Sequence, residues 1–312
     1  MKVLSVLFYL SSFFIIFTTV YLYIFPANSE FKLVSPVREK AVIPGINQWF
    51  PKEVLGAQVA EPKVSAKASF FVETGSSEVL YTKNIHEQLP IASLAKVMTV
   101  LIALEHKSLE NLYTVSTSAA SAEPDKMFLI RDEKLSLKEL LYGIFLISAN
   151  DAAEVIAEGT LEGGREEFIQ EMNRKAGQLG MKNTRFVNPT GLDEDEGGSY
   201  SSTYDLVLLT RHLIKRYPEV VNISNIDHIN LAKTENHQDY DMYSGINLLT
   251  TYPGVVGFKT GFTPQAGYTL ITLARKDGKE VVGVILDSQY RRDEAKELLD
   301  YSFSKLDIRN RK

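Results

Sequence analysis

The chain of 312 residues contains no cysteine. Disulfide bonds, a thiolate nucleophile and cysteine-based metal sites are therefore excluded. Histidine is scarce, and none of the five histidines stands at a zinc-ligand spacing such as H-E-x-x-H. The sequence therefore gives no indication of a metal site.

The chain also lacks an excess of positive charge. Its 34 lysines and arginines are outnumbered by 39 aspartates and glutamates, giving a net charge of -5. Nucleic-acid-binding domains need a basic face, so we expect no nucleic-acid partner. Hydrophobic residues at 45% and charged residues at 23% are ordinary for a globular protein, so disorder is expected only locally.

One long segment, Val3 to Phe25, lacks charge altogether. About 23 residues at a rise of about 1.5 Å each reach across the hydrocarbon core of a bilayer. Because no clear A-x-A cleavage pattern follows, we predict an uncleaved transmembrane helix over residues 1–26 rather than a cleaved signal peptide. Charge counting leaves its orientation open. The flanking basic residues are Lys2 before the segment and Lys32, Arg38 and Lys40 after it.

Sustained periodicity is missing from residues 27–66, which we predict to be a tether. The prolines that interrupt this segment are Pro36, Pro44, Pro51 and Pro62. A globular domain is expected over residues 67–308. Its first strands form a hairpin over 69–84, and its last two flank Asp277-Gly278 within 267–288. One helix is expected to carry Ser93. A capping box at Ser202 and Asp205 indicates the start of another. The further expected helices, with the one that this capping box starts, span 135–148, 151–157, 165–179, 202–217 and 291–306. Strands at both ends of the domain predict one shared antiparallel sheet in an α+β fold.

The stretch LPIASLAKVMT, Leu89 to Thr99, places one lysine in an apolar helix pattern. Ser93 and Lys96 are three positions apart and share a helix face. A buried lysine is costly unless it is paired or loses its proton. A neutral lysine beside a serine is a general base beside a nucleophile, although Ser93 could instead be a helix N-cap.

Two further motifs follow in the chain, Ser148-Ala149-Asn150 and Lys259-Thr260-Gly261. Alone, the first could be a helix end followed by an aspartate cap, and the second an ordinary strand and turn. The motifs S-x-x-K, S-D-N and K-T-G occur together in serine β-lactamases and penicillin-binding proteins. Their occurrence here in the same order, at a helix start, a helix end and a hairpin entry, favours the catalytic interpretation.

With these motifs and the flanking stretches FVNPTGLDEDEGGSYSSTYDLVLL and GVVGFKTGFTPQAGYTLI, the chain resembles the serine-type D-alanyl-D-alanine carboxypeptidases, which are low-molecular-mass penicillin-binding proteins. The resemblance covers residues from about Ala68 to Leu306. It implies a β-lactamase/transpeptidase-like α+β domain with a five-stranded antiparallel sheet flanked by helices. It also implies peptidoglycan stem peptides as substrate, β-lactams as inhibitors, no cofactor, and a domain outside the cytoplasmic membrane.

The resemblance assigns the acylation step to the first two motifs. Ser93 would be the nucleophile that forms the acyl-enzyme, and Lys96 the general base, its pKa lowered by burial and by Lys259 as a second cation. Ser148 would relay a proton toward the leaving amine. Asn150 would bind the substrate amide or orient Lys96.

The third motif is implied to bind substrate. Lys259 and Thr260 would hold the terminal carboxylate of the peptide, and Gly261 would let the substrate backbone approach the strand. The oxyanion hole would consist of the backbone N–H groups of Ser93 and Phe262.

The sequence departs from the family pattern in two respects. Many relatives carry a β-rich second domain and an amphipathic anchoring helix, and we expect neither in a chain that stops at Lys312. Ser199 stands where relatives often have histidine, with no catalytic consequence.

The acidic run from Asp193 to Glu196 fits a solvated loop better than a calcium site, because its spacing differs from that of an EF-hand loop.

Three other functions remain open. A class A β-lactamase needs a glutamate that activates the deacylating water, in an E-x-x-L-N setting that no candidate here has. The candidates are Glu162, Glu166, Glu167 and Glu171. A D,D-endopeptidase would use the same site on cross-linked peptides, and a tethered scaffold would have an inactive site.

Overall fold

The computed structural model describes residues 60–194 and 197–310, which belong to the compact unit Glu53–Lys312. The membrane anchor predicted over 1–26 and most of the tether predicted over 27–66 lie outside the described residues. Within the described part, no helix is both long enough and apolar enough to cross a membrane.

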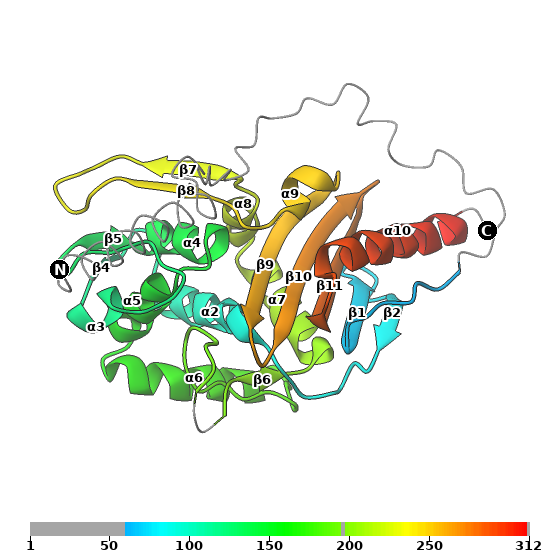
Figure 1. Ribbon diagram of the computed structural model, residues 1–312, viewed down its shortest axis with the longest axis horizontal. Coiled ribbons are helices and arrows are strands. Elements are labelled where there is room, and N and C mark those ends of the chain that lie inside the picture. Colours follow the sequence, from blue (N-terminus) through cyan, green and yellow to red (C-terminus); the bar gives the residue numbers. More distant parts are fainter. Residues whose placement is uncertain (1–59, 195–196, 311–312) are drawn as a thin grey trace, which may run out of the picture. The chain divides into compact units, whose positions relative to one another are not determined.

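A five-stranded antiparallel sheet joins strands from both ends of the described chain, in the order β2-β1-β11-β10-β9 (Figure 1). Its strands are β1 (Ala68–Glu73), β2 (Val79–Lys83), β9 (Val255–Thr263), β10 (Gly267–Lys276) and β11 (Lys279–Ser288). β1 pairs with β11, so the first hairpin and the last strands form one sheet. The predicted α+β arrangement is confirmed.

The β10–β11 turn explains why these two strands pair tightly. Asp277 and Gly278 both have positive φ, 50° and 73°, as a two-residue type I′ hairpin turn requires. Farther along β11, Gly283 lies opposite Phe71 of β1, and a Cβ there would stand 2.2 Å from the Phe71 ring. The glycine therefore leaves room for a buried aromatic side chain in the sheet.

Between β2 and β9 the chain is mainly helical. The longer helices are α2 (Lys96–His106), α4 (Leu137–Leu146), α5 (Asn150–Thr160), α6 (Gly164–Gln178) and α7 (Thr203–Arg216). The shorter ones are the 3₁₀ turn η2 (Ala92–Ala95), α3 (Thr117–Ala120), α8 (Glu219–Ser224) and α9 (Leu248–Thr251). Three two-stranded ribbons pair β3 (Leu89–Pro90) with β6 (Tyr200–Ser201), β4 (Leu112–Thr114) with β5 (Lys134–Ser136), and β7 (His228–Leu231) with β8 (Tyr240–Tyr243). The last helix is α10 (Arg291–Asn310).

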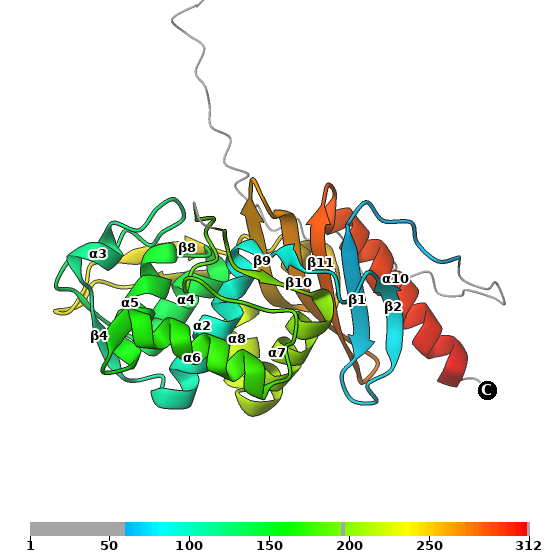
Figure 2. The ribbon, with the colours of Figure 1, turned by 90° about the horizontal axis from the view of Figure 1, so that it is seen from below.

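Helices cover both faces of the sheet (Figure 2). α10 packs on β10, β11 and β2, while α7 packs on β1 and β11 from the other side. β9 is the edge strand beside the helical region, where it contacts η2 and α8. This contact brings the third sequence motif, on β9, next to the first, on η2 and α2.

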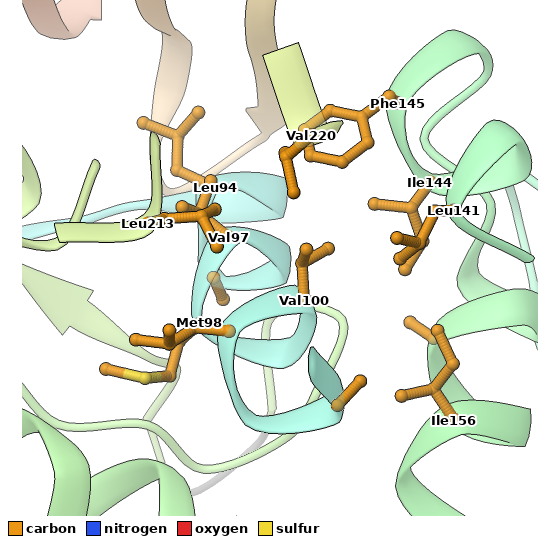
Figure 3. Packing of buried hydrophobic residues seen from close by; sticks show 14 of the residues in the cluster. Leu94, Val97, Met98, Val100, Leu141, Ile144, Phe145, Ile156, Leu213 and Val220 are labelled. Atoms are coloured by element: carbon orange, nitrogen blue, oxygen red, sulfur yellow. The ribbon is translucent and has the colours of Figure 1, made fainter. Parts of the chain in front are cut away.

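α2 lies in the middle of the helical core, and its residues from Lys96 to Leu104 are all buried (Figure 3). Val97, Met98 and Val100 are all 0% exposed. Around them pack side chains from four helices: Leu141, Ile144 and Phe145 of α4, Ile156 of α5, Leu213 of α7 and Val220 of α8. Because this part of α2 is buried all round, Lys96 at its first position is buried as well.

The helix predicted over 135–148 is shorter, because Ser136 starts it. The Glu139 N–H donates to Ser136 Oγ at 3.3 Å, and the Ser136 N–H donates back to Glu139 Oε2 at 2.7 Å. This capping box fixes the start of α4 at Leu137, and Leu135 belongs to β5 instead.

The capping box predicted at Ser202 and Asp205 is only half formed. The Asp205 N–H donates to Ser202 Oγ at 3.2 Å. The Asp205 carboxylate accepts from the Asn183 N–H and the Thr184 hydroxyl, at 2.7 and 2.8 Å. Asp205 therefore ties the start of α7 to the segment after α6.

Candidate active site

Ser93 and Lys96 lie side by side where η2 passes into α2. Lys96 Nζ is 2.9 Å from Ser93 Oγ, with Lys96 at 0% and Ser93 at 9% exposure. No side chain caps η2, so the alternative role of Ser93 as a helix N-cap is wrong. Ala92, directly before the serine, has a φ of 49°, a conformation that is costly for a residue with a Cβ. Packing of the surrounding elements holds this turn and points the hydroxyl at the amine.

The remaining partners of the Lys96 amine are hydrogen-bond acceptors. Nζ donates to Asn150 Oδ1 at 2.7 Å and to the Thr190 carbonyl at 2.8 Å. The Asn150 amide has only one suitable orientation, because its Nδ2 donates to the Glu123 carbonyl. A neutral amine has two N–H donors and one lone pair. With both donors used, the lone pair faces the Ser93 hydroxyl and can take its proton.

Burial favours this neutral state. It lowers the pKa of Lys96 to about 7, although the carboxylates of Asp125, Glu154 and Asp151 raise it in part. Burial also lowers the pKa of Lys259, and the positive charges of Lys96 and Arg291 lower it further. Since charge repulsion is mutual, the state in which both amines are protonated is disfavoured. This is expected for a pair that includes a general base.

A pH dependence follows from the lowered pKa of Lys96. With Lys96 as the predicted general base, the neutral amine would be the active form, so acylation by a β-lactam should rise with pH and level off above about 7. Below that value the rate should fall about tenfold per pH unit, as the fraction of neutral amine does. Stopped-flow acylation rates between pH 5 and 9 would measure this profile. A rate that falls as pH rises through 7 would contradict the assignment of Lys96 as base.

Ser148 and Lys259 form a second contact between the helical region and the sheet. Lys259, on β9, is 1% exposed, and its Nζ donates to Ser148 Oγ at 2.8 Å and to the Thr260 carbonyl at 2.7 Å. Ser148 has a φ of 63° in the turn between α4 and α5. The motif that could have been a helix end therefore spans a strained turn, which aims Ser148 at Lys259 and Asn150 at Lys96.

Gly261 allows β9 to approach the nucleophile. A Cβ at this position would lie 3.0 Å from Ser93 N and 3.1 Å from Ala92 Cβ. The glycine is thus needed for contact between β9 and η2, whereas the sequence interpretation gave it a role only toward substrate. The next residue, Phe262, is 55% exposed, with its ring 4.7 Å from that of Tyr268. The oxyanion role of its backbone N–H remains a prediction.

Arg291 is a cation of this region that the sequence interpretation missed. The guanidinium donates to the carbonyls of Gly261 and Thr269, at 2.5 and 3.2 Å, and lies over the Tyr268 ring. With Thr260 it lines a small cavity of about 40 Å³. One sequence signal was available: Arg291 begins α10, and a cation at a helix N-terminus is disfavoured by the helix dipole.

Two of the glutamates considered for a β-lactamase role have partners outside the motifs. Glu171 pairs with Arg174 on α6, and Glu167 accepts from the Gly163 N–H. Ser199, the departure from the family pattern, accepts from the Val187 N–H at 3.1 Å. The prediction of a solvated acidic loop is wrong for Asp193, which is half-buried and hydrogen-bonded to the β9–β10 turn.

The sequence profile of a peptidase family described as D-alanyl-D-alanine carboxypeptidase matches residues 56–290. The D-alanyl-D-alanine carboxypeptidase DacF of Bacillus subtilis is 35% identical over 257 residues, which are 80% of this chain and 65% of the relative. A D-alanyl-D-alanine carboxypeptidase of Streptomyces sp. K15 is 29% identical over 263 residues, 79% of this chain and 90% of the relative. The chain thus spans just under two thirds of the length of the Bacillus relative.

Two solved structures are similar to this one. A D-alanyl-D-alanine carboxypeptidase from Mycobacterium tuberculosis superposes with a TM-score of 0.73 at 27% identity, over 80% of this chain and 95% of that one. The cefotaxime-bound penicillin-binding protein D2 of Listeria monocytogenes gives 0.68 at 31% identity, over 78% of this chain and 99% of that one. The fold is therefore the transpeptidase-like α+β fold with a five-stranded antiparallel sheet.

Proposed function

The chain belongs to the D-alanyl-D-alanine carboxypeptidase family, and on this premise we propose that it removes the terminal D-alanine from peptidoglycan stem peptides through an acyl-enzyme on Ser93. One observation carries the proposal: the Lys96 amine lies 2.9 Å from Ser93 Oγ and gives its N–H groups to Asn150 and Thr190. This is the arrangement of a nucleophile beside its general base. It contains no histidine and requires no metal.

In the first step, Lys96 takes the proton of Ser93 as Oγ attacks the carbonyl carbon of the penultimate D-alanine. Negative charge then develops on the carbonyl oxygen, where the backbone N–H groups of Ser93 and Phe262 would stabilise it. Collapse of the tetrahedral intermediate breaks the peptide bond. Ser148, whose Oγ is 2.8 Å from Lys259 Nζ, would pass the proton that Lys96 took from Ser93 on to the leaving amine.

The β9 side of the site would bind the terminal carboxylate. Two N–H groups of a protonated Lys259 go to Ser148 and Thr260, so the third can go to the substrate. A bound carboxylate favours the charged form of Lys259 and so offsets the effect of burial. Arg291, behind Thr260, adds a permanent positive charge. Water then hydrolyses the ester to release the shortened peptide.

A second candidate, D,D-endopeptidase activity on cross-linked peptides, uses the same residues. The D-alanyl-D-alanine endopeptidase of Escherichia coli is 29% identical to this chain over 260 residues. To test the proposal, the purified protein is incubated with a stem pentapeptide and, separately, with a cross-linked dimer, and the products are weighed by mass spectrometry. We expect loss of one D-alanine from the pentapeptide at a rate at least about tenfold above dimer cleavage. Faster cleavage of the dimer would favour the endopeptidase.

We further propose that the domain works outside the cytoplasmic membrane, held by residues 1–26 as a single-pass anchor and by 27–66 as a tether. The support is the uncharged segment from Val3 to Phe25 and the location of peptidoglycan. Protease treatment of spheroplasts should degrade the domain while a cytoplasmic marker stays intact. A protected domain would contradict this topology.

A further inference from the structure

Asp193 connects two walls of the candidate active site. Its Oδ1 accepts from the Thr263 hydroxyl at 2.9 Å, and its Oδ2 accepts from the Gln265 N–H at 3.4 Å. Thr263 is the last residue of β9, and Gln265 lies in the turn to β10. A carboxylate that accepts from both positions fastens this turn to the loop that follows α6.

The loop that carries Asp193 also holds the general base. The Thr190 carbonyl accepts from Lys96, and a Cβ on Gly191 would lie 1.8 Å from the Ala92 carbonyl oxygen. Asn188 organises the loop from within, since its Oδ1 accepts from Thr190 N and Gly191 N, at 3.2 and 2.6 Å. Gly191 therefore fixes the loop against the turn that presents Ser93, two residues before Asp193, whose side chain contacts the end of β9.

The opposite wall is an edge strand. β9 pairs with β10 alone in the sheet, and it carries Lys259, Thr260 and Gly261. Its contact with η2 is close, because a Cβ on Gly261 would lie only 3.0 Å from Ser93 N. An edge strand has ladder partners on one side only, so its distance from η2 depends on contacts outside the sheet. The hydrogen bonds of Asp193 to the end of β9 are such contacts.

We propose that Asp193 is a positioning residue that sets the distance between the carboxylate-binding wall, Lys259 and Thr260 on β9, and the nucleophile Ser93. The assignment rests on the proposed function, and it makes the acidic loop part of substrate selection. Asp193 acts through β9 and not through Lys96. Its loss should therefore weaken recognition of the terminal carboxylate while the proton transfer from Ser93 is retained.

The test compares two substrates in four variants. The substrates are a depsipeptide ending in D-lactate, with a free carboxylate, and its methyl ester. In Asp193→Ala and in Thr263→Val, kcat/KM should fall about tenfold for the carboxylate and about twofold or less for the ester, because a small displacement of a binding group is enough for such a loss. The double variant should lose less than the product of the two single losses, since both remove the bond between Thr263 and Asp193. Each variant also removes one bond of its own, from the Gln265 N–H to Asp193 or from the Ala266 N–H to Thr263 Oγ. As a control, Glu110→Ala removes an exposed carboxylate in the turn between α2 and β4, away from the site, and should match the wild type.

Amide hydrogen exchange supplies a readout that does not depend on turnover. In Asp193→Ala, exchange should become faster at the end of β9 and in the turn to β10, and stay unchanged in α2. Asp193→Asn keeps one acceptor for Thr263 and should give an intermediate effect, which covers the case of a poorly folded alanine variant. Equal losses on both substrates, multiplicative losses in the double variant, or unchanged exchange would each overturn the proposal. A wild-type protein that cleaves neither substrate would instead refute the proposed function, while the exchange result still decides the role of Asp193.

Discussion

Replacement of Ser93 by alanine is expected to abolish covalent labelling by a fluorescent penicillin. With Ser93 as the proposed nucleophile, the label would be an ester on its Oγ, so without that atom no bond can form, and acylation should fall by about 10⁴-fold or more. Ser93 is 9% exposed, and its hydroxyl is hydrogen-bonded to the Lys96 amine, which keeps its other two partners in the variant. The fold should therefore survive the loss of this single oxygen. Gel fluorescence after denaturation measures the label, because only a covalent adduct remains.

The matched control is Ser121→Ala. Ser121 is exposed at the end of α3, where its hydroxyl bonds to the carbonyls of Thr117 and Ser118. It should label like the wild type. Reversible binding of penicillin to the Ser93→Ala variant should persist, because Lys259 and Thr260 are untouched, and calorimetry can detect it. Stable labelling of the variant would show that another residue is the nucleophile.

The sequence predicted the parts of the site that depend on local spacing. Ser93 and Lys96 share a face because they are three positions apart, and that relation holds although η2 is a 3₁₀ turn rather than the start of a regular helix. The sheet was predictable because its hairpins carry an alternating pattern and an Asp277-Gly278 turn. That Lys259 and Ser148 belong to one site followed only from the family resemblance, since 111 positions separate them, and their hydrogen bond was not predicted.

What the sequence could not supply were contacts made by backbone groups and by loops. The second acceptor of the Lys96 amine is the Thr190 carbonyl, and a carbonyl group carries no side-chain signature. Asp193 stood in an acidic run that looks solvated until the β9–β10 turn packs against it. The β7–β8 ribbon was missed because its strands have only four residues each, too few for a clear alternating pattern. In each case tertiary packing, rather than the local sequence pattern, decides which contacts form.

Removal of the Lys96 amine is expected to lower the acylation rate by about 10³-fold, within the range that general base catalysis contributes. Lys96→Met tests this better than Lys96→Ala. Lys96 is 0% exposed, so methionine would fill most of its volume, whereas alanine would leave a cavity. The loss of a donor leaves Asn150 Oδ1 and the Thr190 carbonyl without this partner, which costs about 1–3 kcal/mol of stability. Lys83→Met is the matched control, since Lys83 Nζ bonds to the Val64 carbonyl beside β2.

The pH profile separates a lost base from a damaged fold. In the wild type the rate should be half-maximal near pH 7, where burial places the pKa of Lys96, and should reach its plateau above that pH. In Lys96→Met that rise should disappear, leaving a low rate that varies little between pH 6 and 8, because no amine titrates beside Ser93. A merely destabilised enzyme would keep the profile at reduced amplitude. If Lys96→Met stayed within about tenfold of the wild type and kept the inflection, the proton of Ser93 would have to leave by the other amine, through Ser148 to Lys259.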